Sequence, residues 1–401
     1  MGLLRRYPVS FLVIALILWS ATNPLPSLLD AASGALVPDA DLVRPASYVA
    51  IAPVSNVLDA LTFLGLDRAR ALLFTWAGVL ALVGALRPGS VRRRVLRATL
   101  GVLCVIVAVV ATIFLPRPIP RLTVDDPTLT VIDYHAHTRD SHDGRRDWTV
   151  SDLARWHAMQ GFEASYVTDH NRVFQGTTDD QPIALLPGAE WSVDGQHLLA
   201  LGETAPIDPG RYTRDLAALL ALFPELHKQG ALAIASIPEY WRAHWNDLDA
   251  FVRAGIDGFE IVNCAPKAIV FPPDARARVV ALARAHNLLL TGGSDNHGWG
   301  KATCVWNLAK PSAHGFTANR VVARPIALLQ SDRQVWTAGY DQAWLMFRGL
   351  TWPERVSWLT WILVLGIYRA VPRRAGDGGG LGVLARSLKV RVFRRPGPAG
   401  S

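Results

Sequence analysis

Hydrophobic residues are unevenly distributed along the chain. Nearly uncharged apolar runs occupy 9–19, 71–86 and 98–115, whereas 122–345 mixes apolar and polar positions as a globular domain does. A hydrocarbon layer about 30 Å thick requires a helix of roughly 20 mostly apolar residues. The pattern therefore predicts an α-helical membrane region at 1–115, with about three spans, followed by a globular domain at 122–345.

Three further segments qualify this division. The first run reaches spanning length only when it is extended over 9–29, through Pro24 and Pro26, and its basic start also resembles a signal peptide. No clear cleavage site follows, so we expect an uncleaved anchor. Residues 46–66 are apolar but interrupted, which favours a re-entrant or interfacial segment. The Trp-rich segment 346–371 is either an interfacial helix or a fourth span.

Proline and glycine mark the remaining boundaries. Residues 116–121 contain three prolines and predict a stiff linker between the membrane and the domain. Residues 372–401 are rich in Gly, Arg and Pro, which predicts a basic, disordered tail.

Arginine placement predicts an orientation, because short basic loops tend to stay cytoplasmic. Arg5 and Arg6 precede the first run, and five arginines lie within 87–97. The N-terminus and this loop are then cytoplasmic and the domain is extracytoplasmic, although Arg68 and Arg70 fall on the opposite side. The net charge of +8 reflects loops and tail beside anionic lipid, so the bilayer is an expected partner and nucleic acid is not.

The three cysteines carry little information. Cys104 lies inside an apolar run, and Cys264 and Cys304 are far apart in sequence. A Cys264–Cys304 disulfide is permitted outside the cytosol, but we expect isolated buried thiols.

The domain alternates strand-like and helix-like segments. Strands are predicted at 129–134, 164–168, 183–186, 197–201, 231–235, 258–262 and 288–291, and helices at 149–159, 215–229, 247–254 and 273–285. Repeated strand and helix units imply an α/β fold with a mainly parallel sheet, and seven or so units predict a distorted (β/α)7 TIM-like barrel. In such folds the chemistry lies at the C-terminal ends of the strands.

Side chains that bind metals follow these strands. They are His135, His137, Asp143, His170, Glu190, His197, Asp295 and His297. Because alternate residues of a strand share a face, the first two histidines can point at one ion. Imidazole with carboxylate suits zinc, manganese or iron, and a bridging carboxylate can hold two ions. The sequence therefore predicts a divalent metal centre.

Four motifs occur in order: D-Y-H-A-H-T-R-D-S-H-D-G, V-T-D-H-N, P-G-A-E-W-S and G-G-S-D-N-H-G. Together they resemble the PHP (polymerase and histidinol phosphatase) superfamily over 131–298. The resemblance implies one metal held by His135, His137, Glu190 and Asp295, and a second held by Asp143, His170 and His297. In three-metal members Glu190 bridges to a further ion, for which His197 is suited.

One position departs from the family pattern. Ile237, in A-S-I-P, stands where the resemblance requires a histidine, and isoleucine cannot bind a metal. We therefore expect two metal sites and a doubtful third; Glu239 is a less favoured substitute ligand.

The expected function is metal-dependent hydrolysis of a phosphoester by an activated water, at an extracytoplasmic site that needs no side-chain nucleophile. The substrate would be a phosphorylated small molecule or a lipid-borne phosphoester. Two alternatives remain: the same chemistry on a non-phosphate bond, and a non-catalytic metal-binding module of a membrane complex, which the loss at Ile237 would explain.

Several residues beside the motifs have two interpretations. Asp169 and Asn171 either orient His170 or cap the strand end, and Lys267 either contacts substrate or lies in an exposed loop. Trp299 can wall the pocket. His142 is expected at the surface, as are the cations Arg139, Arg145, Arg146 and Lys301, although these four can bind phosphate.

Overall fold

The computed structural model describes residues 7–176, 180–202, 205–208, 215–312, 315–330 and 340–370. The predicted tail at 372–401 lies outside these residues. The chain divides into two compact units, Met1–Ser357 and Trp358–Ser401. The second unit is described only over the larger part of helix α14 (Trp352–Ala370), and the first unit contains the other helices and strands that the structure describes.

The N-terminal region is mainly helical. It contains α2 (Pro8–Ser20), α3 (Ala46–Ala50), α4 (Ala52–Thr62), α5 (Leu66–Leu86), α6 (Val91–Phe114), and a small sheet of β2 (Ala40–Val43) with β3 (Arg121–Val124). Among the described residues, α5 and α6 are long and apolar enough to cross a membrane, which alone is weak evidence of a membrane location. The predicted first span corresponds to α2, which has only 13 residues.

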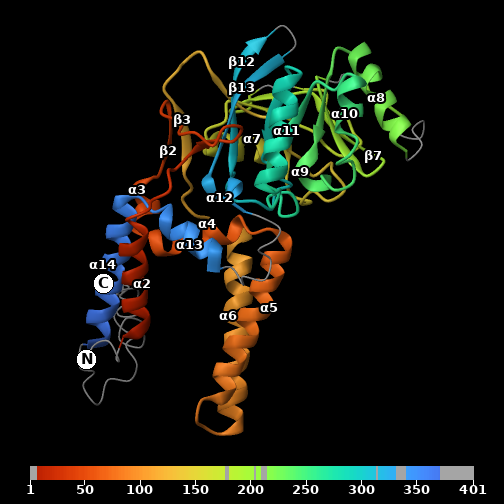
Figure 1. The fold of residues 1–401 in the computed structure, drawn as a ribbon. Helices are drawn as coiled ribbons and strands as arrows, with labels where there is room; N and C mark the ends of the chain where they lie inside the picture. Colours follow the sequence, from red (N-terminus) through yellow and green to blue (C-terminus); the bar gives the residue numbers. More distant parts are fainter. Residues whose placement is uncertain are drawn as a thin grey trace, which may run out of the picture. The chain divides into compact units, whose positions relative to one another are not determined.

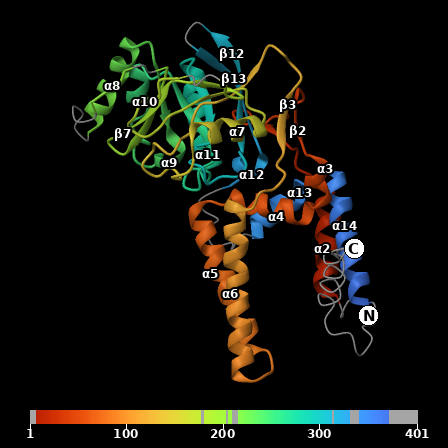
Figure 2. The same cartoon turned by 180° about the vertical axis from the view of Figure 1, so that it is seen from behind.

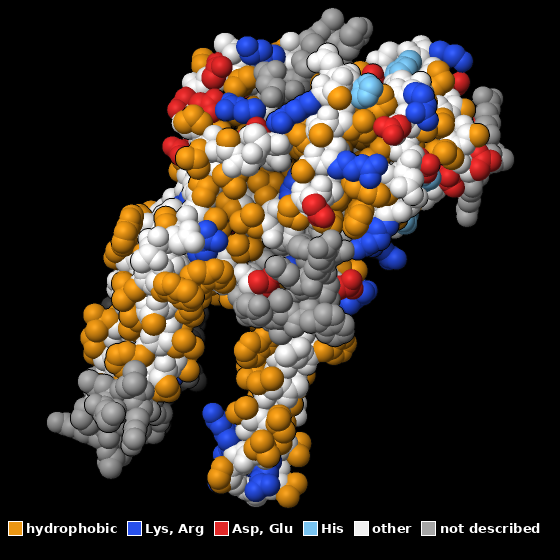
Figure 3. Space-filling model, in the orientation of Figure 1, with side chains coloured by type: hydrophobic (Ala, Val, Ile, Leu, Met, Phe, Trp, Pro, Cys, Tyr) orange, Lys and Arg blue, Asp and Glu red, His pale blue; other side chains and the backbone are white. Residues whose placement is uncertain are grey.

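Helices α5 and α6 run side by side as a hairpin in both views (Figures 1 and 2). Small residues allow this close contact, since a Cβ at Gly84 would lie 2.7 Å from the backbone of Ala98, and one at Gly101 would lie 2.9 Å from Leu80. Figure 3 shows hydrophobic side chains along the hairpin and basic side chains at its far tip. A large exposed apolar surface of this kind is usually covered by a membrane or by another protein.

The domain contains two larger sheets. The first has the order β1-β13-β12-β4-β5-β6 and the second β11-β10-β9-β8-β7. The strands of the first sheet are β1 (Leu29–Asp30), β4 (Thr130–Asp133), β5 (Ala164–Tyr166), β6 (Ala184–Leu186), β12 (Val305–Ser312) and β13 (Gly315–Ala323). The strands of the second sheet are β7 (Gly188–Val193), β8 (Gln196–Leu201), β9 (Leu232–Ser236), β10 (Gly258–Asn263) and β11 (Leu289–Gly293).

The predicted closed barrel is wrong. Both sheets are mixed and open within the described residues, and no strand ladder joins β6 to β7 or β11 to β12. The physical reason is that β12 and β13 form an antiparallel hairpin against β4, and that β7 and β8 pair antiparallel, so the strands do not continue one parallel series. The seven predicted strands exist, but β7 and the β12–β13 hairpin were not predicted.

Helices cover the outer faces of the sheets. They are α7 (Val150–Gln160), α8 (Leu216–Lys228), α10 (Leu248–Arg253) and α11 (Pro273–Ala285). Short α9 (Ile237–Tyr240) follows β9, and α13 (Tyr340–Arg348) packs against α2, α4 and short α12 (Pro325–Leu328). The start of α7 is fixed by a capping box, in which Thr149 and Asp152 bond reciprocally. Between the sheets, Ile132 and Tyr166 of the first pack with Leu199 and Ile234 of the second.

Two isolated parallel bridges link the sheets where their ladders end. One joins Ala136 to Asn296 and the other joins His170 to Glu190. Each bridge contains or adjoins predicted metal ligands. The seam between the two sheets therefore brings together segments that are far apart in sequence.

Cys264 and Cys304 form a disulfide, so the expectation of isolated thiols at these positions is wrong. The bond joins the segment after β10 to the start of β12. The disulfide could not be predicted from the separation of the two cysteines in the sequence. The fold brings them together, because the chain passes through β10 and β11 before it reaches β12.

Candidate metal centre

The eight predicted ligands lie together at the seam. Four groups of three side chains have ligand atoms within 4.8 Å of one another: His135, His137 and Glu190; His137, His170 and His297; His170, Glu190 and His197; and His142, Asp143 and His170. Asp295 joins the first group, because its Oδ1 lies 3.2 Å from His137 Nε2. The three clusters without His142 consist of buried and partly buried residues, and they are compatible with a metal site.

The spacing in the first group suits a shared ion. The Nε2 atoms of His135 and His137 are 3.0 Å apart, and each lies 3.1 Å from Glu190 Oε2. Ligand atoms that surround an ion tetrahedrally at the usual zinc bond lengths lie about 3.4 Å from one another. The side chains therefore already stand near ligand separation.

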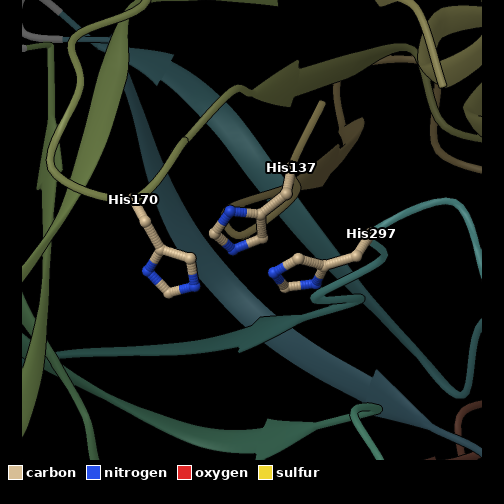
Figure 4. Close-up of side chains that lie close together, drawn as sticks. All are labelled: His137, His170 and His297. Atoms are coloured by element: carbon tan, nitrogen blue, oxygen red, sulfur yellow. The ribbon is translucent and has the colours of Figure 1, made fainter. Parts of the chain in front are cut away.

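The second group lies beside the first. Figure 4 shows the rings of His137, His170 and His297 close together, and the His137 and His297 centroids are 3.9 Å apart. Asp143 Oδ1 is 3.1 Å from His297 Nε2 and 3.7 Å from His170 Nε2. Glu190 extends toward a third position, with Oε1 2.5 Å from His197 Nδ1.

Hydrogen bonds fix which ring nitrogen of His135 and of His137 faces the centre of the cluster. Ser141 Oγ donates to Asp169 and so accepts from His137 Nδ1 at 2.8 Å. Glu260 accepts from His135 Nδ1 at 3.1 Å. Both histidines therefore turn Nε2 toward the carboxylates of Glu190 and Asp295. The two Nε2 atoms lie 3.0 Å apart and face these carboxylates, an arrangement that suits a shared cation.

Several buried ligand atoms make no hydrogen bond within the described residues. They are His170 Nδ1, Glu190 Oε1, Asp295 Oδ1 and His297 Nε2. Histidine nitrogens and carboxylate oxygens of neighbouring ligands lie 2.5–3.1 Å apart, but not at hydrogen-bonding angles. Short distances without hydrogen-bonding angles are expected when ligand atoms point at a common centre and not at one another. Orphaned buried acceptors are costly unless another group binds them, so this donor set fits a metal.

The electrostatics of the cluster favour positive charge. Burial opposes protonation of His135, but Asp295, Glu190 and Glu260 outweigh it and raise the pKa of that imidazole well above its usual range. Burial likewise disfavours ionisation of Glu190, but His135 and His197 hold its carboxyl pKa well below the ordinary value. The pKa of Asp295 is lowered in the same way. The carboxylates therefore stay ionised and attract a cation.

The backbone is adapted to this crowding. A Cβ at Gly293 would overlap Glu260 and the side chain of His135, so only glycine fits there. Asp295 has φ +46°, in the left-handed region that non-glycine residues rarely adopt. Such conformations cluster at functional sites because the surrounding structure must impose them.

Sequence reasoning missed Glu260. It lies in β10, is fully buried and also accepts hydrogen bonds from Ser236 and Asn263. A carboxylate that holds the second nitrogen of a metal-binding histidine is common in metal sites. Asp169, for which two roles were open, binds Thr138 and Ser141 and so acts on the histidines through Ser141.

Ile237, which stands where the resemblance would require a histidine, supplies no ligand to a third position. Ile237 is buried in the hydrophobic core at the start of α9. Glu239 is in none of the ligand clusters formed by described residues, and its Oε1 is held by Lys267 Nζ at 3.1 Å. The third position therefore offers Glu190, His170 and His197.

A cavity of about 720 Å³ opens beside the cluster. Lys267, whose role was open, lines it, and Trp299 lies on its wall as predicted. His142 is exposed, as expected, and lies close to Asp143 and His170. Arg145 binds Asp147 and the carbonyl of Gly298, which braces the loop and does not line the cavity.

No protein-family model and no curated protein matches the chain. Among solved structures, the chain is similar to the crystal structure of PsfC from Pseudomonas syringae PB-5123, with 20% sequence identity over 55% of this chain and 98% of PsfC, at a TM-score of 0.36. A similarity of this size leaves the function to be argued from the site residues themselves.

Proposed function

We propose that the chain is a metal-dependent phosphoesterase of the PHP type. The observation that carries the proposal is the convergence of histidine nitrogens and carboxylate oxygens on common points at the sheet seam. His135, His137, Glu190 and Asp295 would hold one ion, and Asp143, His170 and His297 a second.

The chemistry follows from these residues. Divalent ions at such a site lower the pKa of a bound water and neutralise charge on a phosphoryl group. The carboxylates of Glu190 and Asp295 remain ionised and negatively charged, because their pKa values are lowered. Ser141 and Glu260 keep the histidine rings oriented. No side-chain nucleophile is required.

We further propose an integral membrane protein with an extracytoplasmic catalytic domain. The α5 helix has 21 residues, about 31 Å of rise, which matches the hydrocarbon thickness. Exposed arginines at the hairpin tip favour a cytoplasmic tip, and Arg68, which opposed this orientation, is paired with Asp341 at 2.7 Å. The Cys264–Cys304 disulfide is typical of an oxidising compartment.

A non-catalytic metal-binding module is the second candidate, because Ile237 removes a ligand that the resemblance requires. Turnover decides between them. The measurement is hydrolysis of p-nitrophenyl phosphate and bis-p-nitrophenyl phosphate by the full chain in nanodiscs, after chelation and again after addition of Mn²⁺ or Zn²⁺.

We expect multiple turnovers that chelation abolishes and metal restores. Asp295→Asn should lower the rate by at least about 100-fold, because it removes a proposed direct ligand and even outer partners of a metal site contribute 10–100-fold. Asp274→Asn, at an exposed carboxylate in the first turn of α11, is the matched control and should leave the rate unchanged. Metal binding without turnover on either ester would favour the non-catalytic module.

A further inference from the structure

The cavity beside the metal centre has two chemically different halves. One half is polar and includes the proposed ligands Asp143, His170, His197, Asp295 and His297. The other half comes from the N-terminal region and is mainly apolar: Leu61, Phe63, Leu64, Leu66, Ala69, Val109 and Ile113. A small water-soluble phosphoester would leave this second half unused.

The apolar half is the root of the α5–α6 hairpin. Leu66, the first residue of α5, donates its backbone N–H to Pro266 O at 2.6 Å, in the segment that carries Lys267. At the other helix, Phe114, the last residue of α6, meets Trp299 edge-on with centroids 6.5 Å apart. Trp299 in turn donates to Asp143 O. The hairpin is thus tied to the loops that hold the metal ligands.

The polar residues of this wall do not make it hydrophilic. Thr62 donates its hydroxyl to Leu58 O at 2.8 Å, and Thr112 donates to Val109 O at 2.7 Å. Both hydroxyl protons are therefore bound within their own helices, and the Thr62 oxygen also accepts from Arg117 at 3.0 Å. The surface that this wall presents to a ligand therefore consists mostly of carbon atoms.

Further apolar side chains are exposed along the hairpin beyond the cavity. Phe74, Leu82 and Leu86 of α5 and Val107 of α6 are more than half exposed. If the hairpin spans a bilayer, its root lies at the level where lipid chains meet headgroups. A lipid could then place its phosphate in the polar half while its chain stays against the hairpin.

We infer that the substrate is a phosphoester attached to an aliphatic chain, and that the chain lies along Leu66, Ala69 and Val109. This inference rests on the proposed phosphoesterase function. The metal centre recognises the phosphate, and the hairpin root recognises the hydrocarbon. A cavity of about 720 Å³ is within the range of sites for ligands of this size.

The test uses the full chain in nanodiscs with a series of single-chain probes, ethyl, butyl, hexyl and octyl phosphate, and the matching non-hydrolysable alkylphosphonates. Each methylene transferred from water into an apolar site contributes about 0.8 kcal/mol, which is about fourfold in affinity. We expect phosphonate affinity, measured by calorimetry, and kcat/KM to rise together with chain length until the apolar half is filled.

A variant pair locates the chain-binding surface. Ala69→Trp places a large ring in the apolar half and should lower the ratio of octyl to ethyl phosphonate affinity at least tenfold. Ala108→Trp, on an exposed position of α6 outside the cavity, is the matched control and should keep the ratio of the wild type. An octyl phosphate probe with a photoreactive chain end should label residues of α5 or α6.

The outcomes separate the two proposals. Equal affinity for all chain lengths, or labelling confined to the domain, would overturn the inference even if short phosphates are hydrolysed. Chain-dependent phosphonate binding without any hydrolysis would support the lipid site and contradict the phosphoesterase function. Loss of octyl preference in Ala108→Trp as well as Ala69→Trp would also overturn the inference, because the effect would not belong to the cavity.

Discussion

Asp59 of α4 is predicted to be critical for stability, because it is a buried carboxylate shared by three partners. Its Oδ1 accepts from Arg117 at 3.0 Å, and its Oδ2 accepts from Arg324 at 3.1 Å and from Tyr48 at 3.0 Å. These partners come from the linker after α6, the end of β13 and α3. The contacts hold the root of the α5–α6 hairpin against the domain.

The magnitude is set by the charges that Asp59→Ala would leave unpaired. Breaking a buried ion pair from one side costs about 3–5 kcal/mol, because the remaining charge stays buried. Arg117 would keep its bond to Thr62, and Arg324 would stay 4.7 Å from the centre of the Phe63 ring. A cavity of about 70 Å³ beside Asp59 could admit water. We therefore expect Asp59→Ala to lower the free energy of unfolding by about 3 kcal/mol, the lower end of this range.

The assay is thermal unfolding of the full chain in nanodiscs, followed by tryptophan fluorescence. For a domain of this size, about 3 kcal/mol corresponds to a decrease in Tm of roughly 6–12 °C. Asp67→Ala removes an exposed Asp–Arg pair, with Arg70 at 3.1 Å, and should cost less than about 0.5 kcal/mol. Equal Tm values for the two variants would refute the assignment of Asp59 as a buried charge hub.

Two further predictions concern the covalent and ionic links of the domain. Replacing Cys264 and Cys304 together by serine should lower the free energy of unfolding by about 2–4 kcal/mol, since the disulfide closes a loop of about 40 residues; a reductant should lower the Tm of the wild type similarly and leave the variant unchanged. Arg320 bonds Asp39 and lowers its carboxyl pKa, so the pair stabilises the folded state above the unfolded pKa of about 3.9 and loses this effect as the pH falls through the lower folded pKa. Asp39→Asn should therefore cost about 0.2–1 kcal/mol at pH 7 and progressively less below pH 4, as measured by denaturant titration; a cost that grows toward low pH would contradict the sign.

Local patterns predicted the elements of the domain but not their closure. The strands around Ile132 and Phe259 and the helix at 273–285 follow from apolar periodicity and a first-turn proline. Pairing direction depends on contacts across the whole chain. The sequence of Val305–Ala323 alone does not predict that β12 of its hairpin will pair antiparallel with β4. This pairing is the reason that the sheets stay open.

The candidate ligands were more predictable than their environment. Histidine and aspartate at strand ends were chosen by residue type, and the seam brings all eight predicted ligands together. Glu260 was missed because a carboxylate inside an apolar strand has no motif around it. A usable signal was present, since a charge flanked by Phe259 and Ile261 in a buried strand requires a partner. Cys264–Cys304 was missed because pairing is a property of the fold.

Metal content is the most direct test of the central claim that these side chains form a metal centre. The full chain, loaded with Mn²⁺ or Zn²⁺ and freed of excess metal, is measured by mass spectrometry of dissolved ions beside His137→Ala and His286→Ala. His137 belongs to two of the ligand clusters, whereas His286 is an exposed residue at the end of α11. We predict two or more ions per chain in the wild type and in His286→Ala, and the loss of at least one in His137→Ala. A wild type that retains no ion, or a His137→Ala variant that retains them all, would contradict the account.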